Sequence, residues 1–207
     1  MKLYYFNLRN LAEPIRCLLH YQEVPFEDIR VEMSDWPALK KKMPQGTLPV
    51  LEVDGRKLAQ STSIMRYLGR IYNLTGKNHI ERQIVDSIAD LVKDLYTQLG
   101  PYYYVRLGIR SGDIDKLKKE HLLPAVESKF PIFQKYLREA HSGFYAKSGL
   151  TYVDFVVAEY FDIINAMNPE VFEAYPELIE HMERIHDLPT LKPYIESRPS
   201  AHADVKQ

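Results

Sequence analysis

The hydrophobic pattern of the chain changes once, between residues 73 and 79, and this change limits the possible folds more than any other feature. The segment from Asn73 to His79 is polar and contains a glycine. Before it, strand-like and helix-like runs alternate, whereas after it the apolar residues recur at helical spacing. The sequence therefore predicts an α/β domain over residues 1–76 and an all-helical domain over residues 80–207.

The first domain contains the clearest local signal, a β-hairpin from Pro49 to Leu58. The Asp54-Gly55 pair between its two runs is typical of a type I′ turn. Ser61 follows as the expected N-cap of a helix. Upstream, we expect a strand at Leu3–Phe6, a helix at Leu11–Tyr21 with Pro14 in its first turn, a strand at Phe26–Glu32 and a short helix from Asp35 to Met43. This order indicates a mixed sheet covered by helices.

The second domain is predicted to contain helices alone. Its first helix carries Ile84, Ile88 and Leu95 on one face and is expected to be interrupted near Gly100-Pro101. The other expected elements are a helix from about Ile114 to about Arg138, a capping box at Thr151–Asp154 with Asp in place of the usual Glu, and a helical stretch from His181 to Ile195 broken at Pro189 and Pro193.

Charge and hydropathy exclude several classes of protein. Lys and Arg number 27 against 28 Asp and Glu, so the formal net charge of −1 leaves no basic excess for nucleic acid. No apolar run approaches the ~20 residues needed to span a bilayer, and the first residues lack a signal-peptide core. The single cysteine, Cys17, fits a reducing compartment and a place in the core. We expect a soluble, cytoplasmic protein without nucleic-acid or membrane partners.

Familiar catalytic motifs are missing from the chain. It has no G-x-G-x-x-G, P-loop, G-x-S-x-G or H-E-x-x-H sequence. The nearest pair of its seven histidines, His181 and His186, is five residues apart and badly spaced for one helix face. We interpret the histidines as surface residues and expect no metal site.

A set of short motifs in fixed order resembles the cytosolic glutathione transferases, and in particular their sigma class, which includes glutathione-dependent prostaglandin D synthases and many nematode enzymes. The motifs are Tyr5–Arg16, Asp35-Trp36-Pro37 with Lys40, Gly46–Leu51, Gln60-Ser61, Arg66–Leu68, Val85–Asp90 and Thr151–Asp154. The resemblance covers essentially the whole chain. It implies a thioredoxin-like N-terminal domain, an all-α C-terminal domain and glutathione as co-substrate.

Tyr5 is the candidate catalytic residue. A thiol with a pKa near ~8.5 is mostly protonated at neutral pH, and a phenol that hydrogen-bonds sulfur favours the nucleophilic thiolate. The resemblance gives this role to the tyrosine at the end of the first strand, which is Tyr5. Tyr4 is its rival, and strand alternation places the two on opposite faces.

The resemblance also implies the residues that bind glutathione. A cis bond before Pro49 would leave the backbone of Leu48 free to pair with the cysteinyl unit, beside Gly46 and Thr47. The free N–H groups where Gln60 and Ser61 begin a helix suit the γ-glutamyl carboxylate. The remaining candidates are Trp36 and Lys40 at the glycyl end, and Asp90 reaching the γ-glutamyl amine from the partner subunit of a homodimer, in which Arg66 and Arg70 could meet the acidic stripe of Asp86, Asp90 and Asp94.

The electrophile is expected beside the sulfur, between the domains, in a site with aromatic and apolar walls. Two positions depart from the family pattern: Asn10 replaces the usual glycine, and Leu11 stands where some prostaglandin synthases have arginine. The candidate wall residues are Phe6, Leu11, Tyr102, Tyr103, Tyr104 and Leu107.

The resulting hypothesis is a glutathione transferase that conjugates the thiolate to hydrophobic electrophiles in detoxification, without a metal or a covalent enzyme intermediate. Two alternatives stay open. One is isomerisation of prostaglandin H to D by the same thiolate, which Leu11 makes less attractive. The other is a carrier of haem or hydrophobic ligands with little turnover.

Overall fold

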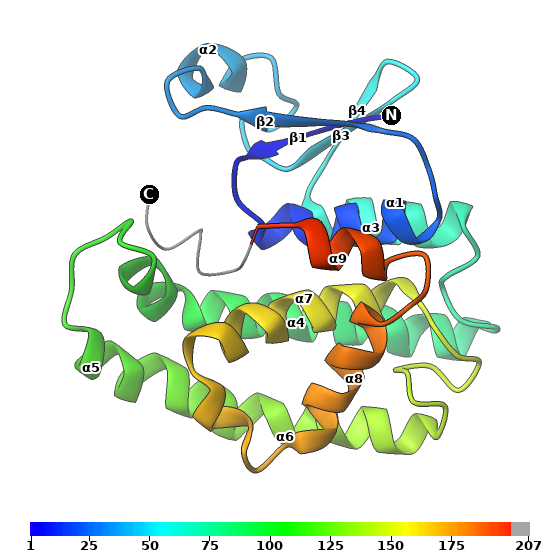
Figure 1. Cartoon of the computed structure of the whole chain (residues 1–207), viewed down its shortest axis with the longest axis vertical. Coiled ribbons are helices and arrows are strands. Elements are labelled where there is room, and N and C mark those ends of the chain that lie inside the picture. Colours follow the sequence, from blue (N-terminus) through cyan, green and yellow to red (C-terminus); the bar gives the residue numbers. More distant parts are fainter. Residues whose placement is uncertain (200–207) are drawn as a thin grey trace.

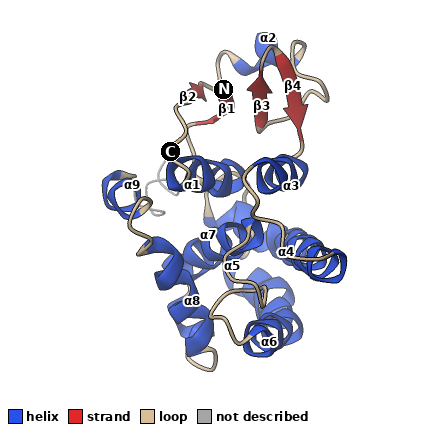
Figure 2. Cartoon of the chain, turned by 90° about the vertical axis from the view of Figure 1, so that its right-hand side faces the viewer, coloured by secondary structure: helices blue, strands red, loops and turns tan. Residues whose placement is uncertain are grey.

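A four-stranded sheet forms one end of the molecule, in a computed structural model that describes residues 1–199. Helices α1 (Glu13–Tyr21) and α3 (Ser61–Ile71) run beneath the sheet, and the other long helices lie below them (Figure 1). The view turned by 90° shows the same succession (Figure 2). The predicted fold class, an α/β part followed by helices, is confirmed. The end of the predicted helical domain, residues 200–207, lies outside the described residues.

The sheet has the strand order β2-β1-β3-β4. Strand β1 (Lys2–Phe6) is parallel to β2 (Glu27–Val31) and antiparallel to β3 (Val50–Val53), which pairs antiparallel with β4 (Arg56–Ala59). In the turn between β3 and β4, Asp54 has φ 49° and Gly55 has φ 76°. Both angles are positive, as a type I′ turn requires, so the predicted hairpin is confirmed.

The helices next to the sheet start and end differently from the prediction. Helix α3 begins at Ser61, and its N-cap is Gln60 with φ 72°, so the assignment of Ser61 as N-cap is wrong by one residue. The positive φ of Gln60 turns the chain out of β4 one residue earlier than expected. Helix α2 (Trp36–Lys40) stops short of Met43. A 3₁₀ turn, η1 (Asn10–Ala12), precedes α1, and Pro14 lies in the first turn of α1 as predicted.

Helix α4 (His79–Arg106) continues through Pro101, so the predicted interruption is wrong. Proline removes one backbone donor from a helix interior, but tertiary packing can outweigh that loss. Leu99, Tyr102 and Tyr103 are buried on either side of Pro101 and hold the helix against its neighbours.

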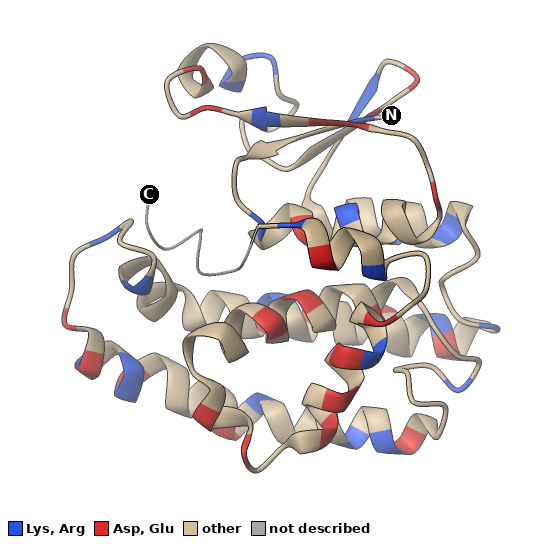
Figure 3. Cartoon of the chain, viewed as in Figure 1, with Lys and Arg blue, Asp and Glu red and all other residues tan. Residues whose placement is uncertain are grey.

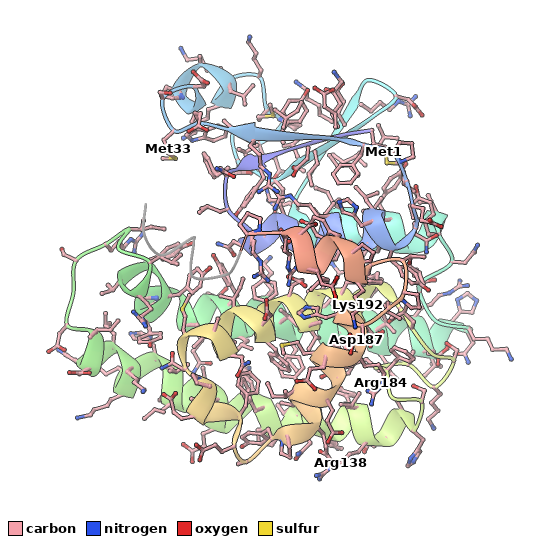
Figure 4. The ribbon with its side chains drawn as sticks, viewed as in Figure 1. Met1, Met33, Arg138, Arg184, Asp187 and Lys192 are labelled. Atoms are coloured by element: carbon pink, nitrogen blue, oxygen red, sulfur yellow. The ribbon has the colours of Figure 1, made fainter. Side chains whose placement is uncertain are left out.

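The chain from 114 to 140 is helical, close to the predicted span. Pro193 lies in the first turn of α9, where no donor is needed, so it does not break the helix, whereas the predicted break at Pro189 falls between α8 and α9. Asp187 and Lys192 face each other across this break with Oδ1 and Nζ 2.8 Å apart (Figure 4). The elements are α5 (Ile114–Leu117), the π-helical segment η2 (Lys118–Leu122), α6 (Leu123–Ala140), α7 (Tyr152–Met167), η3 (Pro169–Phe172), α8 (Pro176–His186) and α9 (Lys192–Ser197).

The predicted capping box begins α7, a largely buried helix, and is confirmed with Asp154 as its acidic member. The Thr151 backbone N–H donates to Asp154 Oδ2 at 2.7 Å. Asp154 Oδ1 also lies 2.9 Å from His181 Nε2, and His181 is fully buried. The interpretation of this histidine as a surface residue is therefore wrong. His186 is also mostly buried, with Nε2 2.9 Å from Glu159 Oε1.

One hydrophobic core joins the two halves of the molecule. It includes Leu3 from the sheet, Leu68 from α3 and Phe155 from α7, all fully buried. At Gly69 a Cβ atom would lie 2.7 Å from Cδ1 of Tyr152, so the approach of α3 to the start of α7 requires glycine. The halves are thereby held in direct contact.

Candidate active site

Tyr5 and Tyr4 lie on opposite faces of β1, as alternation predicts. Tyr5 is 4% exposed and lies on the face that packs on the helices, where the Arg16 guanidinium is 6.0 Å from its ring centroid. Tyr4 Oη instead donates to Glu52 Oε2 on β3 at 3.3 Å, and burial together with Glu52 raises the pKa of Tyr4. Tyr5 is therefore the tyrosine that faces the rest of the protein.

Four tyrosines from α4 and α7 form an aromatic wall opposite the N-terminal part: Tyr96, Tyr103, Tyr104 and Tyr160. The Tyr96 ring is edge-on to Tyr103 at 5.7 Å and to Tyr160 at 5.4 Å, and its hydroxyl is 3.4 Å from that of Tyr104. Burial raises the pKa of Tyr96 and of Tyr160, and the ionised form of Tyr5 would raise both further.

A cavity of about 190 Å³ lies between the two halves and brings some predicted site residues together. Gln60 and Ser61, at the start of α3, share it with Leu11. Sequence reasoning missed Tyr96 and Tyr160, although Ala89, Val92 and Tyr96 follow helical spacing on α4, as do Val156 and Tyr160 on α7. The full lining is Leu11, Pro14, Gln60, Ser61, Thr62, Met65, Ala89, Val92, Lys93, Tyr96, Thr97, Val156 and Tyr160.

A second, more open cavity of about 1050 Å³ lies far along α4, between Lys77–Ile84 and Tyr136–Ser148. None of its lining residues belongs to the predicted glutathione or electrophile site. Its size alone does not make it the active site, because Gln60 and Ser61, which are expected to bind a carboxylate, line the smaller cavity. Tyr5 is not among the lining residues of either cavity.

The other glutathione-binding candidates lie around the loop between α2 and β3. The Leu48–Pro49 bond is cis, and Pro49 is buried at the start of β3, whereas Thr47 is exposed. Gly46 has φ 60°, and the Lys40 side chain folds over it, since a Cβ there would lie 3.5 Å from Lys40 Cε.

Two side-chain contacts extend this region toward the tyrosine and toward α3. Trp36 packs edge-on against Phe6 with centroids 5.5 Å apart. The Phe6 ring centroid in turn lies 5.8 Å from that of Tyr5, so the three rings form one run of aromatic contacts. The Gln60 amide donates to Gln45 Oε1 at 2.6 Å, which ties this loop to the start of α3.

The electrophile candidates separate into two groups. Tyr103 and Leu107 pack with Ile163, and Tyr104 joins them at the edge. Tyr102 points elsewhere: it is buried in the main core, and its hydroxyl donates to Asn168 Oδ1 at 2.7 Å. The structure therefore does not bring Tyr102 together with Tyr103 and Tyr104, because its side chain points into the main core.

Two members of the acidic stripe on α4, Asp86 and Asp90, are paired within the chain. Arg66 Nε is 3.2 Å from Asp86 Oδ1, and Arg66 Nη2 is 2.6 Å from Asp90 Oδ1. The expectation that Arg66 meets this stripe in a partner subunit is therefore corrected: α3 and α4 of one chain place the groups side by side. The Asp90 side chain remains 62% exposed.

An ionic cluster, which sequence reasoning did not find, joins the halves beside the site. Arg9 donates to Glu159 Oε2 at 3.1 Å and also contacts Asp162 on α7. Arg198 Nη1 lies 2.7 Å from the same Glu159 oxygen and 3.1 Å from Glu13 Oε1. Figure 3 shows charged positions of both signs where α1, α7 and α9 come together. The members are Arg9, Glu13, Arg16, Glu159, Asp162 and Arg198.

Glu159 is charged although it is buried. Burial alone would raise its pKa, but Arg198, His186 and Arg9 together hold the pKa well below the ordinary glutamate value. No signal in the sequence could have paired these residues, because Arg9 and Arg198 are far from Glu159 along the chain.

Comparisons with known proteins agree with this arrangement. Residues 1–70 match the family described as Glutathione S-transferase, N-terminal domain, and residues 93–198 match Glutathione S-transferase, C-terminal domain. Glutathione S-transferase 1 of Ascaris suum is 39% identical over 198 residues, which are 96% of each chain. The chain belongs to the glutathione S-transferase family, as the resemblance of its motifs predicted. It is a glutathione transferase, and glutathione is its co-substrate.

Solved structures are similar over almost the full length. The glutathione S-transferase from Ascaris lumbricoides has a TM-score of 0.91 at 39% identity, covering 96% of this chain and 97% of its own. Monomeric Na-GST-3 from Necator americanus has a TM-score of 0.91 at 40% identity, with the same coverage. A prostaglandin synthase D of Nilaparvata lugens has a TM-score of 0.85 at 33% identity, covering 96% of this chain and 98% of its own.

Within residues 1–199, no helix is both long and apolar enough to cross a membrane.

Proposed function

We propose that Tyr5 activates glutathione by hydrogen-bonding its sulfur. The observation that carries this proposal is the orientation of the two neighbouring tyrosines, since Tyr5 faces the helices beside the site and Tyr4 is tied to Glu52 on the other face. The bound thiol loses its proton to solvent, and the phenol donates a hydrogen bond to the resulting thiolate and so favours the ionised sulfur. The thiolate then attacks an electrophilic carbon, a C–S bond forms, and the leaving group departs with the electron pair of its bond. Proximity of the two bound substrates supplies much of the remaining acceleration.

Glutathione would lie across the loop between α2 and β3 and the start of α3. Ser61 begins an eleven-residue helix, where free N–H groups favour the γ-glutamyl carboxylate. Leu48 would pair through its backbone with the cysteinyl unit, while Lys40 and Trp36 would receive the glycyl carboxylate end. Gly46, Thr47, Pro49 and Gln60 complete this proposed set.

The electrophile would lie against Phe6, Leu11, Tyr103, Tyr104 and Leu107, with Tyr96 and Tyr160 added from the cavity lining. The hydrogen bond of Tyr102 to Asn168 supports a packing role for that residue instead. Aromatic side chains with polar tips suit flat aromatic electrophiles. Detoxification of such compounds is the corresponding biological role.

We also propose that the chain belongs to the sigma class and is cytoplasmic. Its first domain would end at residue 76, and its second would begin at residue 80. We further propose a homodimer in which Asp90 of each subunit reaches the glutathione of the other. The exposure of Asp90 supports this role, although a related hookworm enzyme is monomeric. Sedimentation equilibrium tests the dimer. An unchanged KM for glutathione in Asp90→Asn would show that Asp90 does not bind glutathione.

We also propose that no metal takes part. Two groups of potential ligands lie close together, Glu13 with Cys17 and Glu159, and Glu159 with Asp162 and His186. The guanidinium of Arg198 already contacts all of these residues and supplies the positive charge that their carboxylates require.

One observation supports each of two other functions. Similarity to a prostaglandin synthase D supports isomerisation by the same thiolate, and product analysis on the endoperoxide tests it. The large cavity beside Tyr136 would suit a hydrophobic-ligand carrier. Tight binding in a spectral titration without conjugation would favour that role.

The main test compares glutathione conjugation to chlorodinitrobenzene by the wild type, Tyr5→Phe and Tyr4→Phe. A hydrogen bond to a charged group contributes ~1.5–3 kcal/mol, so Tyr5→Phe is expected to lose roughly tenfold to a hundredfold in rate at pH 7. Tyr4→Phe is the matched control and should keep its rate. Damage only in Tyr4→Phe would reverse the assignment of the two tyrosines.

A further inference from the structure

Asn10 occupies an unusual position directly after Arg9, in the loop between β1 and α1. It has φ 31°, a conformation that asparagine tolerates better than most residues, and it is only 7% exposed. Its side chain leaves the N-terminal part and reaches α4, where the amide nitrogen lies 3.1 Å from Tyr96 Oη. The loop that follows Tyr5 is therefore bonded directly to the aromatic wall.

The amide of Asn10 is only half satisfied. Its Oδ1 is buried and has no hydrogen-bond partner among residues 1–199. Because a tyrosine hydroxyl both donates and accepts, either orientation of the amide makes the bond to Tyr96 and leaves the other amide atom alone. A buried amide with one unpaired atom is a poor choice for packing. The contact with Tyr96 thus accounts for Asn10 better than burial does.

Tyr96 is the residue on which this contact acts. Its ring lines the cavity that also holds Leu11 and Ser61. Its edges meet the rings of Tyr103 and Tyr160, and its hydroxyl lies between Asn10 and Tyr104. A ring that contacts two neighbouring rings and is bonded at its hydroxyl has one orientation. Loss of the Asn10 bond leaves the hydroxyl with its 3.4 Å contact to Tyr104 and permits other orientations.

We propose that Asn10 is a positioning residue for the electrophile site, acting through the hydroxyl of Tyr96 to fix the plane of that ring. The inference rests on the electrophile site proposed above. A fixed ring plane favours flat aromatic electrophiles, and it matters little for a slender one. Asn10 therefore sets selectivity between electrophiles, whereas the ionisation of bound glutathione depends on Tyr5.

The test is a double-mutant cycle of Asn10→Gly, Tyr96→Phe and the double variant. Glycine keeps the positive φ and removes the amide, and phenylalanine removes one hydroxyl only, so each change spares the fold in a different way. Asn73→Gly is the matched control, since Asn73 has φ 57° on the surface away from the site. KM and kcat are measured for chlorodinitrobenzene and for allyl isothiocyanate, together with the thiolate absorbance of bound glutathione.

We expect each single variant to raise the KM for chlorodinitrobenzene about fivefold, with the double variant no worse than the poorer single one, as coupled residues behave. The KM for allyl isothiocyanate should rise less than the KM for chlorodinitrobenzene, so that the ratio of the two changes. The KM for glutathione and the thiolate absorbance should stay at wild-type values, as should every parameter of Asn73→Gly.

Three results would overturn the inference: an unchanged ratio of the two electrophile KM values, additive effects, or a fall in thiolate absorbance. The last would place Asn10 at the sulfur itself. Failure of the Tyr5 proposal is distinct, because it would show as normal thiolate absorbance in Tyr5→Phe. If Asn10→Gly does not fold, Tyr96→Phe with an unchanged electrophile ratio still overturns the inference.

Discussion

Arg9 and Asn10 are consecutive residues, yet they connect the N-terminal part to two very different regions of the helical part. Arg9 enters the ionic cluster with Glu159 and Asp162, where opposite charges are buried against one another. Asn10 enters the aromatic wall, where a neutral amide and neutral hydroxyls make the polar contacts. Each charged group of the ionic cluster has several partners, whereas each polar group of the aromatic wall has few.

The difference implies two separate roles: the ionic cluster holds the domains together, and the aromatic wall shapes the site. Removing one partner of a buried ion pair leaves an uncompensated charge, which costs far more than the loss of a neutral hydrogen bond. The ionic cluster should therefore govern stability. The aromatic wall borders the cavity and should govern which molecule reacts. The loop after Tyr5 is anchored to the ionic cluster through Arg9 and contacts the aromatic wall through Asn10.

The largest effect is expected when the ionic cluster loses a cation. Arg198 is 5% exposed and contacts Glu13, Glu159 and Asp162. Arg198→Met should lower the free energy of unfolding by about 3–5 kcal/mol, because it leaves buried carboxylates short of positive charge. Urea denaturation measures this loss. The exposed Arg56→Met is the control, and equal midpoints for the two variants would mean that the cluster does not hold the domains.

The same cluster predicts a loss of stability in acid. The pKa of Glu159 is lower in the folded protein than in the unfolded chain, so its contribution is present above the unfolded value of about 4.3 and is lost as the pH falls toward the folded pKa. Melting temperature should therefore fall from about pH 5 downward. Glu159→Gln should be less stable at pH 7 and show a shallower decline. An acid profile parallel to the wild type would assign the decline to other groups.

Ser61 should affect binding without affecting stability, in contrast to Arg198. We expect the Ser61 hydroxyl to donate to the bound carboxylate beside the backbone N–H groups at the start of α3. Loss of this one hydrogen bond costs ~1.5–3 kcal/mol, so Ser61→Ala, which keeps the backbone N–H, should raise the KM for glutathione at least about tenfold. Ser63, exposed in the same turn, is the matched control. Equal KM values for both variants would remove Ser61 from the carboxylate site.

The smallest effect concerns Cys17, which lies at the edge of the ionic cluster. Burial, followed by the charges of Glu159 and Glu13, raises the pKa of its thiol well above the ordinary value. The thiol should therefore resist an aromatic disulfide reagent in the native protein and react once urea unfolds the chain. Arg198 Nη1 lies 3.5 Å from Cys17 Sγ, so Arg198→Met should speed labelling. Rapid labelling of the wild type would contradict this burial.

Features encoded by neighbouring residues were predictable from the sequence. The Asp54-Gly55 turn and the Thr151–Asp154 box depend on local backbone chemistry, and the opposite facing of Tyr4 and Tyr5 follows from strand alternation. The glutathione transferase family followed from short motifs in order. These predictions need no knowledge of distant contacts.

Features decided by tertiary packing were not predictable. Pro101 lies inside α4 because buried neighbours on both sides hold that helix. His181 is buried because Asp154, from another helix, offers an acceptor. Tyr96 belongs to the site because α4 packs beside Asn10 and Leu11. The conformational preferences of neighbouring residues do not predict such pairings between distant parts of the chain.

The central claim, that Tyr5 stabilises the glutathione thiolate, is tested most directly by titrating the ultraviolet absorbance of enzyme-bound thiolate against pH. In the wild type and in Tyr4→Phe, the bound thiol is expected to ionise below the free-thiol pKa of about 8.5. In Tyr5→Phe the midpoint should move up toward that free value while glutathione still binds. Coincident titrations of the wild type and Tyr5→Phe would contradict the claim.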